Sequence, residues 1–500
     1  MKSAICNYAL LFAGCVVFHI AGTWNLPLID RDEPRFAEAS REMIERADYI
    51  VPYFNNQLRL DKPPLAYWAQ SVSYRVFGES DFAARFPSAI AAALTAVVIF
   101  AWGMRLGRDK LGWWAAIIFT LSLQTFVHAK AAVADMWVVL LMTLASCAGY
   151  DLLVDSTRAA ARPAVAPYPQ TRWWLTFYLS LALGFLAKGP IAWTPLLTVA
   201  VVIIYTRKWQ LLARFKFVRG ILLMLVVVAL WGIPALIQTH GEFFRVGIGR
   251  HVVSRSFMTF EGHGASSVGM YVLLLPFYFV TVFISFFPWS IKVPWLIRKL
   301  WRDREARVNA PGYSEIPIDA YLLSGIAVVF VIFTLVSTKL PHYTLPAFPL
   351  LALLLARHWP EAVTSRRPSF KTIAIVIACV WAVVALVIPP MVAPFFPAYQ
   401  LFEQSSLSLQ PNMQFAAVEF QEPSVVWYFR SRLKSFLTTL NKRRAAEFMT
   451  TPGPRLLVLP TPVARSLFTN APPDWQSFRT SGFNIAKGKR VDLTLLVKPE

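Results

Sequence analysis

The chain has 500 residues, of which 56% are hydrophobic and only 15% are charged, and its formal net charge is +21. This composition excludes an ordinary soluble globular domain and indicates a polytopic α-helical membrane protein. The Lys and Arg residues gather in short loops between apolar segments, where the positive-inside bias of membrane proteins predicts them. We therefore attribute the charge to topology and to contact with anionic membrane lipids, and not to nucleic-acid binding.

Eleven apolar segments are candidates for membrane helices, because a bilayer core of ~30 Å needs about 20 helical residues. They lie at about 7–24, 83–103, 112–128, 133–154, 173–187, 190–206, 219–238, 268–290, 319–337, 344–357 and 371–392. The first segment lacks a clear cleavage site, so we expect it to be a retained helix. Alternating the spans from a cytoplasmic N-terminus leaves the basic clusters inside and the C-terminal segment outside.

Several basic residues nevertheless fall in the predicted outer loops, among them Arg35, Lys62 and Arg255. Because their position opposes the topological bias, they indicate an anionic substrate on the outer side. The sequence Asp61-Lys62-Pro63-Pro64 places a cation in a stiffened segment, and Lys62, Arg255 and Lys339 are candidate phosphate ligands. For each one alone, a solvated loop charge is an equally good explanation.

The outer loop 25–82 follows the first span directly and is rich in charge. Its Asp32 is the preferred candidate for the acid that accepts a proton from, or orients, an acceptor group. Asp135, at the outer end of the fourth span, is the second candidate, although stabilisation of its helix is the structural alternative. The spacing in 37–46 predicts an amphipathic helix lying in the membrane interface.

A divalent metal, zinc or magnesium, is a candidate cofactor because five of the seven histidines fall on the predicted outer face. Asp61 with His251 is the preferred pair, although the chain has no HExxH or Cys/His metal spacing and unliganded histidines are the simpler explanation. No Walker-type loop or dinucleotide fingerprint is present, so no nucleotide is expected.

The composition changes after residue 392, where polar turns alternate with strand-like runs at 456–459 and 493–497 and with a helical stretch at 425–440. The sequence therefore predicts two parts. Residues 1–392 form a transmembrane region that includes the outer loop 25–82 with amphipathic helices, and residues 393–500 form a small soluble α/β domain.

Six motifs occur in an order that resembles a known family. They are Asp32-Glu33-Pro34-Arg35-Phe36-Ala37-Glu38, Arg41-Glu42-Met43, Asp61-Lys62-Pro63-Pro64-Leu65, Phe82-Ala83-Ala84-Arg85, Leu186-Ala187-Lys188-Gly189 and Lys339-Leu340-Pro341-His342-Tyr343-Thr344-Leu345-Pro346. The ordered set resembles the aminoarabinose (lipid A) transferases and their relatives in the protein O-mannosyltransferase superfamily. This resemblance implies a GT-C fold with about 11–13 transmembrane helices.

The resemblance also implies roles for individual residues. Asp32 would be the catalytic-site acid, and Asp61 and His251 would contribute to a metal site. The donor phosphate would be contacted by Arg35, Lys62, Arg255 and Tyr343. Glu33 and Lys339 are further candidate substrate-binding residues, and Asp135 remains the second catalytic candidate.

The expected function is an inverting transfer of a sugar from polyprenyl (undecaprenyl) phosphate to a periplasmic acceptor, lipid A or a related glycolipid. The expected location is the bacterial inner membrane, with the C-terminal domain in the periplasm. The alternatives are a protein O-mannosyltransferase-like enzyme and a lipid or sugar transporter (flippase). A transporter predicts ionisable groups in the middle of its spans, whereas here they gather at the outer ends.

Overall fold

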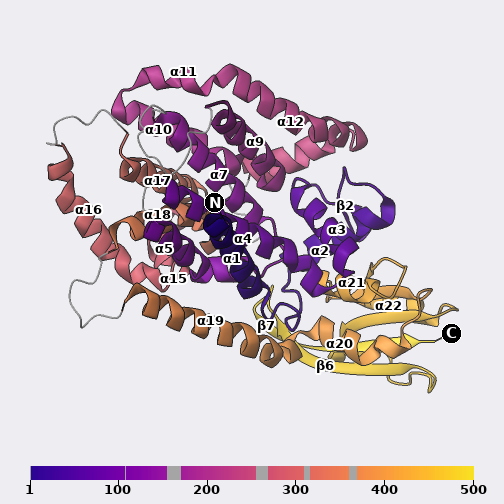
Figure 1. The fold of residues 1–500 in the computed structure, drawn as a ribbon. Helices are drawn as coiled ribbons and strands as arrows, with labels where there is room; N and C mark the ends of the chain where they lie inside the picture. The colour runs from indigo at the N-terminus through magenta and orange to yellow at the C-terminus, as the bar shows by residue number, and fades with distance from the viewer. Residues whose placement is uncertain are drawn as a thin grey trace.

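The computed structural model describes residues 2–106, 109–154, 170–254, 268–308, 316–359 and 369–499. A bundle of helices makes up most of the molecule, and a smaller domain with a β-sheet lies at one end of it (Figure 1). The long loop after the first helix folds into the space between these two parts, where α2 and α3 lie.

The bundle has helices in each predicted apolar segment and two more, at 212–215 and 293–308, in predicted connections. They are α1 (Lys2–Ile20), α4 (Asp81–Arg105), α5 (Asp109–Thr120), α6 (Leu123–His128), α7 (Asp135–Leu153), α9 (Gln170–Lys188), α10 (Thr194–Thr206), α11 (Leu212–Phe215), α12 (Phe217–Gln238), α14 (Val268–Leu273), α15 (Phe277–Ser285), α16 (Val293–Val308), α17 (Ile318–Leu335), α18 (Phe348–His358) and α19 (Phe370–Val392). Within the described ranges, five helices are long and apolar enough to cross a membrane, or six if one bent pair forms a single span.

Several predicted spans are therefore broken helices. The segment 112–128 divides into α5 and α6, and the helical segments 277–285 and 289–303 meet at an angle of 119°. Short helical segments precede two others, namely η1 (Pro190–Trp193) before α10 and η5 (Pro341–Ala347) before α18. Prolines occur at most of these breaks, because proline removes a backbone donor and clashes with the preceding turn.

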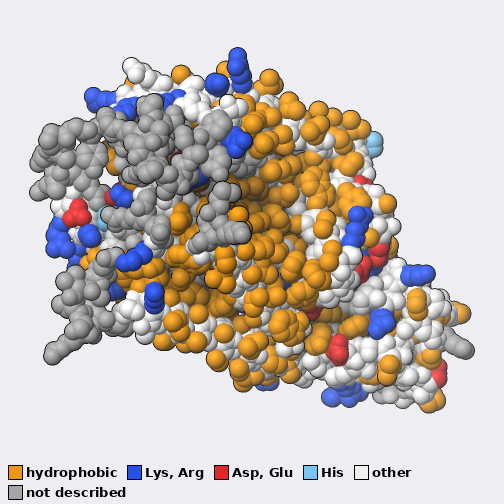
Figure 2. Space-filling view, in the orientation of Figure 1, with side chains coloured by type: hydrophobic (Ala, Val, Ile, Leu, Met, Phe, Trp, Pro, Cys, Tyr) orange, Lys and Arg blue, Asp and Glu red, His pale blue; other side chains and the backbone are white. Residues whose placement is uncertain are grey.

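The helices differ in how much of their apolar surface is covered. In α7, 78% of an apolar stretch of 18 residues is buried inside the protein. In the helical stretches that contain α12 and α19, only 22% of the corresponding stretch is buried. On the face shown in Figure 2, hydrophobic side chains cover the bundle, and charged side chains lie mainly toward its edges. This pattern suits a bundle whose central helices contact protein and whose outer helices contact lipid.

Close contact between α4 and α5 depends on two glycines. A Cβ on Gly103 would lie 2.5 Å from Cα of Gly112, so the two backbones meet where neither residue has a side chain. Small residues at such crossings allow the dispersion contacts that hold membrane helices together.

The C-terminal domain has a five-stranded sheet in the order β4-β3-β5-β7-β6. The strands are β3 (Gln414–Val418), β4 (Thr438–Leu440), β5 (Arg455–Pro460), β6 (Gln476–Asn484) and β7 (Lys489–Lys498), with helices α20 (Pro397–Ser405), α21 (Pro423–Arg430), α22 (Lys442–Thr450) and α23 (Thr461–Leu467). Strand β3 is parallel to β4 and β5, whereas β7 is antiparallel to β5 and β6. The predicted strands 456–459 and 493–497 lie within β5 and β7, but the predicted helix 425–440 ends at Arg430 and is followed by β4.

The outer loop contains α2 (Asp32–Arg46), a hairpin of β1 (Tyr53–Phe54) and β2 (Gln57–Leu58), and α3 (Leu65–Phe77). The amphipathic helix predicted at 37–46 lies within α2, which packs between α3 and α21 of the C-terminal domain. Most of its side chains, including the charged Glu38, Arg41 and Glu42, are buried there. Its position in the membrane interface stays a prediction.

Candidate functional site

A cavity of about 710 Å³ lies where the bundle, the outer loop and the C-terminal domain meet. It is lined by residues from all three parts, and among these are Asp32, Arg35, Asp61, Lys62, Asp135 and Tyr343, which the sequence predicted as site residues. Ile485 and Ala486 of the C-terminal domain form part of the cavity wall. The structure thus brings together residues separated by more than 300 positions in the chain.

Helix α2 places two of these residues on the cavity. Asp32 is the first residue of the helix and Arg35 follows one turn later, so their side chains share one face. The Asp32 carboxylate also lies where the positive end of the helix dipole favours a negative charge. Asp32 is exposed to the cavity and is therefore accessible to a substrate group.

Lys62 reaches the cavity from the segment between the hairpin and α3, next to an ion pair that the sequence did not predict. Arg59 lies 3.2 Å from a carboxylate oxygen of Asp61 and donates a 2.9 Å hydrogen bond to the hydroxyl of Tyr67. Burial disfavours the charged guanidinium, but the Asp61 carboxylate outweighs this effect and raises the pKa of Arg59 above its usual range. Arg59 is thus a fixed cation in the cavity wall.

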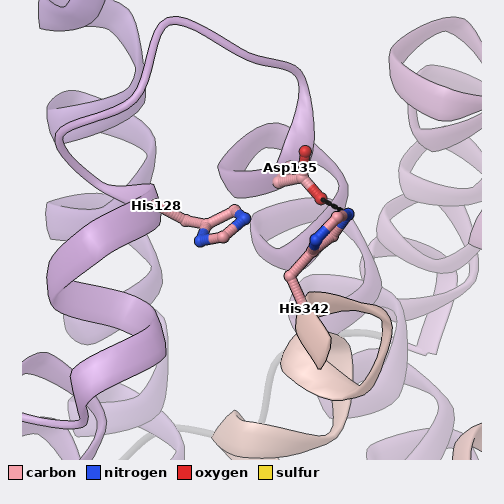
Figure 3. A group of neighbouring side chains, drawn as sticks. All are labelled: His128, Asp135 and His342. Carbon is pink, nitrogen blue, oxygen red and sulfur yellow. Dashed lines mark ion pairs between the residues drawn. The ribbon is translucent and has the colours of Figure 1, made fainter. Parts of the chain in front are cut away.

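Asp135 begins α7 and is held by a lysine from the end of α9. The ammonium Nζ of Lys188 lies 2.5 Å from Oδ1 of Asp135, and Nε2 of His342 lies 3.8 Å from the same oxygen. Figure 3 shows His128 from α6 and His342 from η5 on either side of this carboxylate. The ligand atoms of His128, Asp135 and His342 all lie within 4.8 Å of one another.

Sequence reasoning did not assign roles to Arg59, Lys188, His128 and His342 in this site. Lys188 lies in one of the six motifs and ends an apolar helix directly before Gly189 and Pro190. His342 also lies in a motif, whereas His128 had only its predicted position on the outer side. Their meeting depends on how α6 and η5 pack against α7, which no local pattern contains.

Two predicted substrate contacts have structural partners instead. Glu33 is buried and its carboxylate pairs with Arg85 at 2.7 Å, while it also accepts hydrogen bonds from the backbone N–H groups of Ile29 and Ala132. Nζ of Lys339 donates to the carbonyls of Phe333, Thr334 and Val336 near the end of α17, where a cation complements the helix dipole. Neither residue is among those that line this cavity, and their contact with substrate stays a prediction.

The remaining predictions concern Arg255 and the metal pair. Arg255 lies outside the described residues, and His251 falls in the helical segment Phe243–Ser254, of which only the backbone at this position is described. Asp61 lies on the cavity, but the guanidinium of Arg59 already supplies its carboxylate with a cation. The metal pair of Asp61 and His251 stays a prediction.

Asp30 connects the cavity to the C-terminal domain. Its carboxylate accepts hydrogen bonds from the backbone N–H of Ser424 at 2.8 Å and from the Ser424 hydroxyl at 2.5 Å. Burial raises the pKa of Asp30 to about 7, despite these hydrogen bonds. Asp30 therefore changes its charge near neutral pH at the border between the two parts of the molecule.

The chain is similar in sequence to proteins named as sugar transferases. Residues 61–233 match the family described as dolichyl-phosphate-mannose-protein mannosyltransferase. The undecaprenyl phosphate-alpha-4-amino-4-deoxy-L-arabinose arabinosyl transferase 2 of Sodalis glossinidius is 30% identical over 68% of this chain and 58% of its own length. The transferase of Enterobacter sp. (strain 638) is 26% identical over 100% of this chain and 87% of its own length. The chain thus matches less than two thirds of the Sodalis relative.

The fold is that of a solved bacterial protein. The crystal structure of ArnT from Cupriavidus metallidurans bound to undecaprenyl phosphate aligns with a TM-score of 0.77 and 17% identity over 97% of both chains. Its apo state aligns with a TM-score of 0.76. The chain therefore has the GT-C fold of a multi-pass membrane protein, and its sequence is similar to the aminoarabinose transferases.

Proposed function

We propose that this chain is a membrane glycosyltransferase that moves a sugar, with inversion, from undecaprenyl phosphate to lipid A or a related glycolipid. The observation that carries this proposal is the cavity where Asp32, Lys62 and Asp135 meet from three distant segments. The names of the relatives and the bound undecaprenyl phosphate of the ArnT structure support this donor. In this proposal the cavity end of the bundle faces the periplasm and the N-terminus is cytoplasmic, in the bacterial inner membrane.

The cavity carries both signs of charge, which suits such a transfer. Its lining includes five cationic side chains, Arg31, Arg35, Arg59, Lys62 and Lys188, and five carboxylates, Asp30, Asp32, Asp61, Asp135 and Glu242. As the bond between sugar and phosphate breaks, negative charge grows on the phosphate oxygens. Cations already fixed in a partly enclosed site stabilise that charge more strongly than water does. Lys62 and Arg35 are the proposed phosphate ligands, with the Tyr343 hydroxyl as a further donor.

The carboxylates act on the acceptor in this proposal. An inverting transfer is a single displacement, so the acceptor oxygen attacks the sugar carbon from the side opposite the departing phosphate. A hydroxyl acceptor needs a base, and Asp32 would take its proton. A phosphate acceptor is already an anion, and Asp32 would then position it. Asp135 positions the ammonium of Lys188 in the cavity.

A protein O-mannosyltransferase-like activity is the second candidate, because residues 61–233 match that family. The two candidates share a lipid-phosphate donor and differ in the acceptor. Supplying purified protein with the labelled donor and either lipid A or a periplasmic protein acceptor separates them. A flippase would move the labelled donor across the bilayer without forming a product.

The catalytic proposal is tested by transfer from undecaprenyl-phosphate-linked aminoarabinose to lipid A in liposomes, followed by mass spectrometry. We expect Asp32→Asn to lower the rate by about 10²–10⁴-fold, the usual contribution of a general base or positioning carboxylate. Glu45→Gln is the matched control, because Glu45 lies on the same helix and pairs with Arg430 of the C-terminal domain. Full activity of Asp32→Asn would exclude the role of Asp32.

A further inference from the structure

The group His128, Asp135 and His342 has the ligand types of a transition-metal site. The three side chains come from the end of α6, the start of α7 and η5, and their ligand atoms lie within 4.8 Å of one another. Figure 3 shows both imidazole rings beside the Asp135 carboxylate. Three atoms at such distances can each reach a single ion at about 2.0–2.2 Å after small side-chain movements.

The chemistry of this group selects a class of ion. Two imidazoles and one carboxylate favour Zn²⁺, Co²⁺ or Mn²⁺, whereas Mg²⁺ and Ca²⁺ prefer sites made of oxygen ligands. Three protein ligands also leave a coordination position open, as in catalytic zinc sites. Asp135 and His342 line the cavity, so an ion bound here would be accessible from it.

One imidazole is held by a neighbouring side chain, as metal-ligating histidines usually are. Nδ1 of His128 lies 2.8 Å from the side-chain nitrogen of Gln124, one helical turn earlier. As a metal ligand, His128 needs the Gln124 amide turned so that its oxygen accepts from Nδ1–H, which leaves Nε2 for the ion and restrains the ring. Partners of this kind orient the ligand, and their loss typically weakens metal binding about 10–100-fold.

Lys188 would compete with a metal ion for the same carboxylate. Its ammonium lies 2.5 Å from Oδ1 of Asp135 and 5.8 Å from the centre of the Tyr343 ring. A divalent ion and an ammonium group cannot both lie against one carboxylate oxygen without strong repulsion. Metal binding would therefore displace the ammonium from Asp135 toward the cavity that it already lines.

We propose that His128, Asp135 and His342 bind one divalent transition-metal ion of the Zn²⁺, Co²⁺ or Mn²⁺ class, and that this ion and the Lys188 ammonium exclude each other. The site is distinct from the Asp61 and His251 pair predicted from the sequence. Because the proposal concerns binding, it does not depend on the transferase activity and is tested without it.

The test titrates Co²⁺ into the full-length protein, purified in detergent and stripped of metal with a chelator. Visible absorption reports the coordination of bound Co²⁺, and competition with a chromophoric chelator gives the affinity for Zn²⁺. We expect one equivalent to bind. His128→Ala weakens binding by about tenfold or more, as does His342→Ala, whereas Lys188→Met strengthens it because the competing ammonium is gone.

His240→Ala is the matched control, since His240 is an exposed histidine outside this group and its loss leaves binding unchanged. Tryptophan fluorescence melting shows whether each variant is folded. If His128→Ala does not fold, Gln124→Ala replaces it, with an expected loss of about 10–100-fold. Equal affinities for His128→Ala, His240→Ala and wild type would overturn the proposal. So would the absence of a bound-Co²⁺ spectrum in both wild type and Lys188→Met, which would leave Asp135 and Lys188 as an ion pair alone.

Discussion

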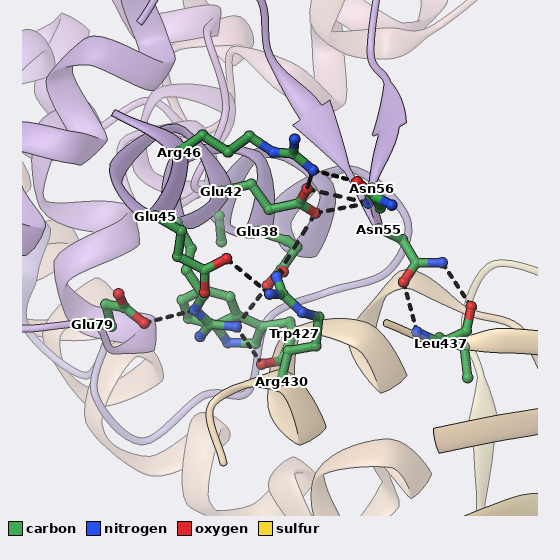
Figure 4. A network of polar contacts seen from close by, with 12 residues as sticks. Glu38, Glu42, Glu45, Arg46, Asn55, Asn56, Glu79, Trp427, Arg430 and Leu437 are labelled. Atoms are coloured by element: carbon green, nitrogen blue, oxygen red, sulfur yellow. Dashed lines mark hydrogen bonds and ion pairs between the residues drawn. The ribbon is translucent and has the colours of Figure 1, made fainter. Parts of the chain in front are cut away.

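Two sets of charged residues on α2 lie in opposite surroundings. On the face toward the C-terminal domain, Arg41 pairs with Glu38 at 2.6 Å and with Glu79 at 2.6 Å, and its guanidinium lies 3.9 Å from the centre of the Trp427 ring. Arg430 from α21 pairs with Glu38 and Glu45, as Figure 4 shows. In the first turn of the helix, Asp32 and Arg35 line the cavity instead.

The difference teaches how to distinguish structural charge from functional charge in this fold. Charges that other side chains enclose join the C-terminal domain to the outer loop, because a buried ion stays charged only with partners close by. Charges that line a cavity are available to a substrate. Each of the following predictions changes one residue and compares the effect on stability or transfer with the surroundings of that residue.

Arg41→Met should give the largest loss of stability. Arg41 is 2% exposed, and without it Glu38 loses one of its two cationic partners. Removing one member of a buried ion pair costs about 3–5 kcal/mol. We expect a clear fall in the apparent melting temperature in detergent, measured by tryptophan fluorescence. Arg75→Met is the control, because Arg75 is an exposed arginine on α3; an equal fall for both variants would contradict a structural role for the enclosed face.

Lys62→Met should act on transfer and not on stability. The loss of one fixed cation at a developing phosphate charge lowers the rate by about 10²–10³-fold. The initial rate at low donor concentration measures this effect, and the melting temperature should stay that of wild type. Lys442→Met removes a lysine of the C-terminal domain that pairs with Glu419, and it should leave both quantities unchanged. A normal transfer rate for Lys62→Met would show that Lys62 does not stabilise the donor phosphate.

Asp30 lies at the border of the two regions, and its effect should depend on pH. Its pKa is about 7 in the folded protein against an ordinary value of 3.8, so between these values the folded state holds a proton that the unfolded chain has lost. The stabilisation is complete below the ordinary pKa and is lost as the pH rises through about 7. Glu422 and Arg35 are the charged neighbours with opposing influences on this carboxyl.

Melting temperatures between about pH 5 and about pH 8 measure this linkage. Wild type should lose more stability than Asp30→Asn as the pH rises, because the amide cannot ionise and still accepts a hydrogen bond from Ser424. Glu403→Gln changes an exposed acid of α20 and should follow wild type. Parallel curves for Asp30→Asn and wild type would show that Asp30 does not titrate in this range.

Glu45→Gln should have the smallest effect. Glu45 pairs with Arg430 at 2.8 Å but is 42% exposed, and ion pairs at a surface contribute about 0–1 kcal/mol. Its melting temperature and its transfer rate should both stay close to those of wild type. A large loss would mean that the enclosed network extends to the surface of the molecule.

The sequence by itself determined the helical bundle, the separate C-terminal domain and six of the cavity residues. Helices in a bilayer must satisfy their own backbone hydrogen bonds, so long apolar segments reveal them without knowledge of their neighbours. The charged outer motifs likewise identify Asp32, Lys62 and Asp135, because ionisable groups beside membrane spans are costly and rarely incidental.

Only the tertiary structure shows which charged residues form structural ion pairs and which line the cavity. Asp32 and Glu33 are adjacent in the chain, yet Asp32 lines the cavity and Glu33 is enclosed by Arg85, because consecutive residues point in different directions around a helix. His128, Asp135 and His342 meet only through the packing of three separate segments. Hydropathy is a local property and is visible in the sequence, whereas the pairing of distant side chains depends on how the helices pack.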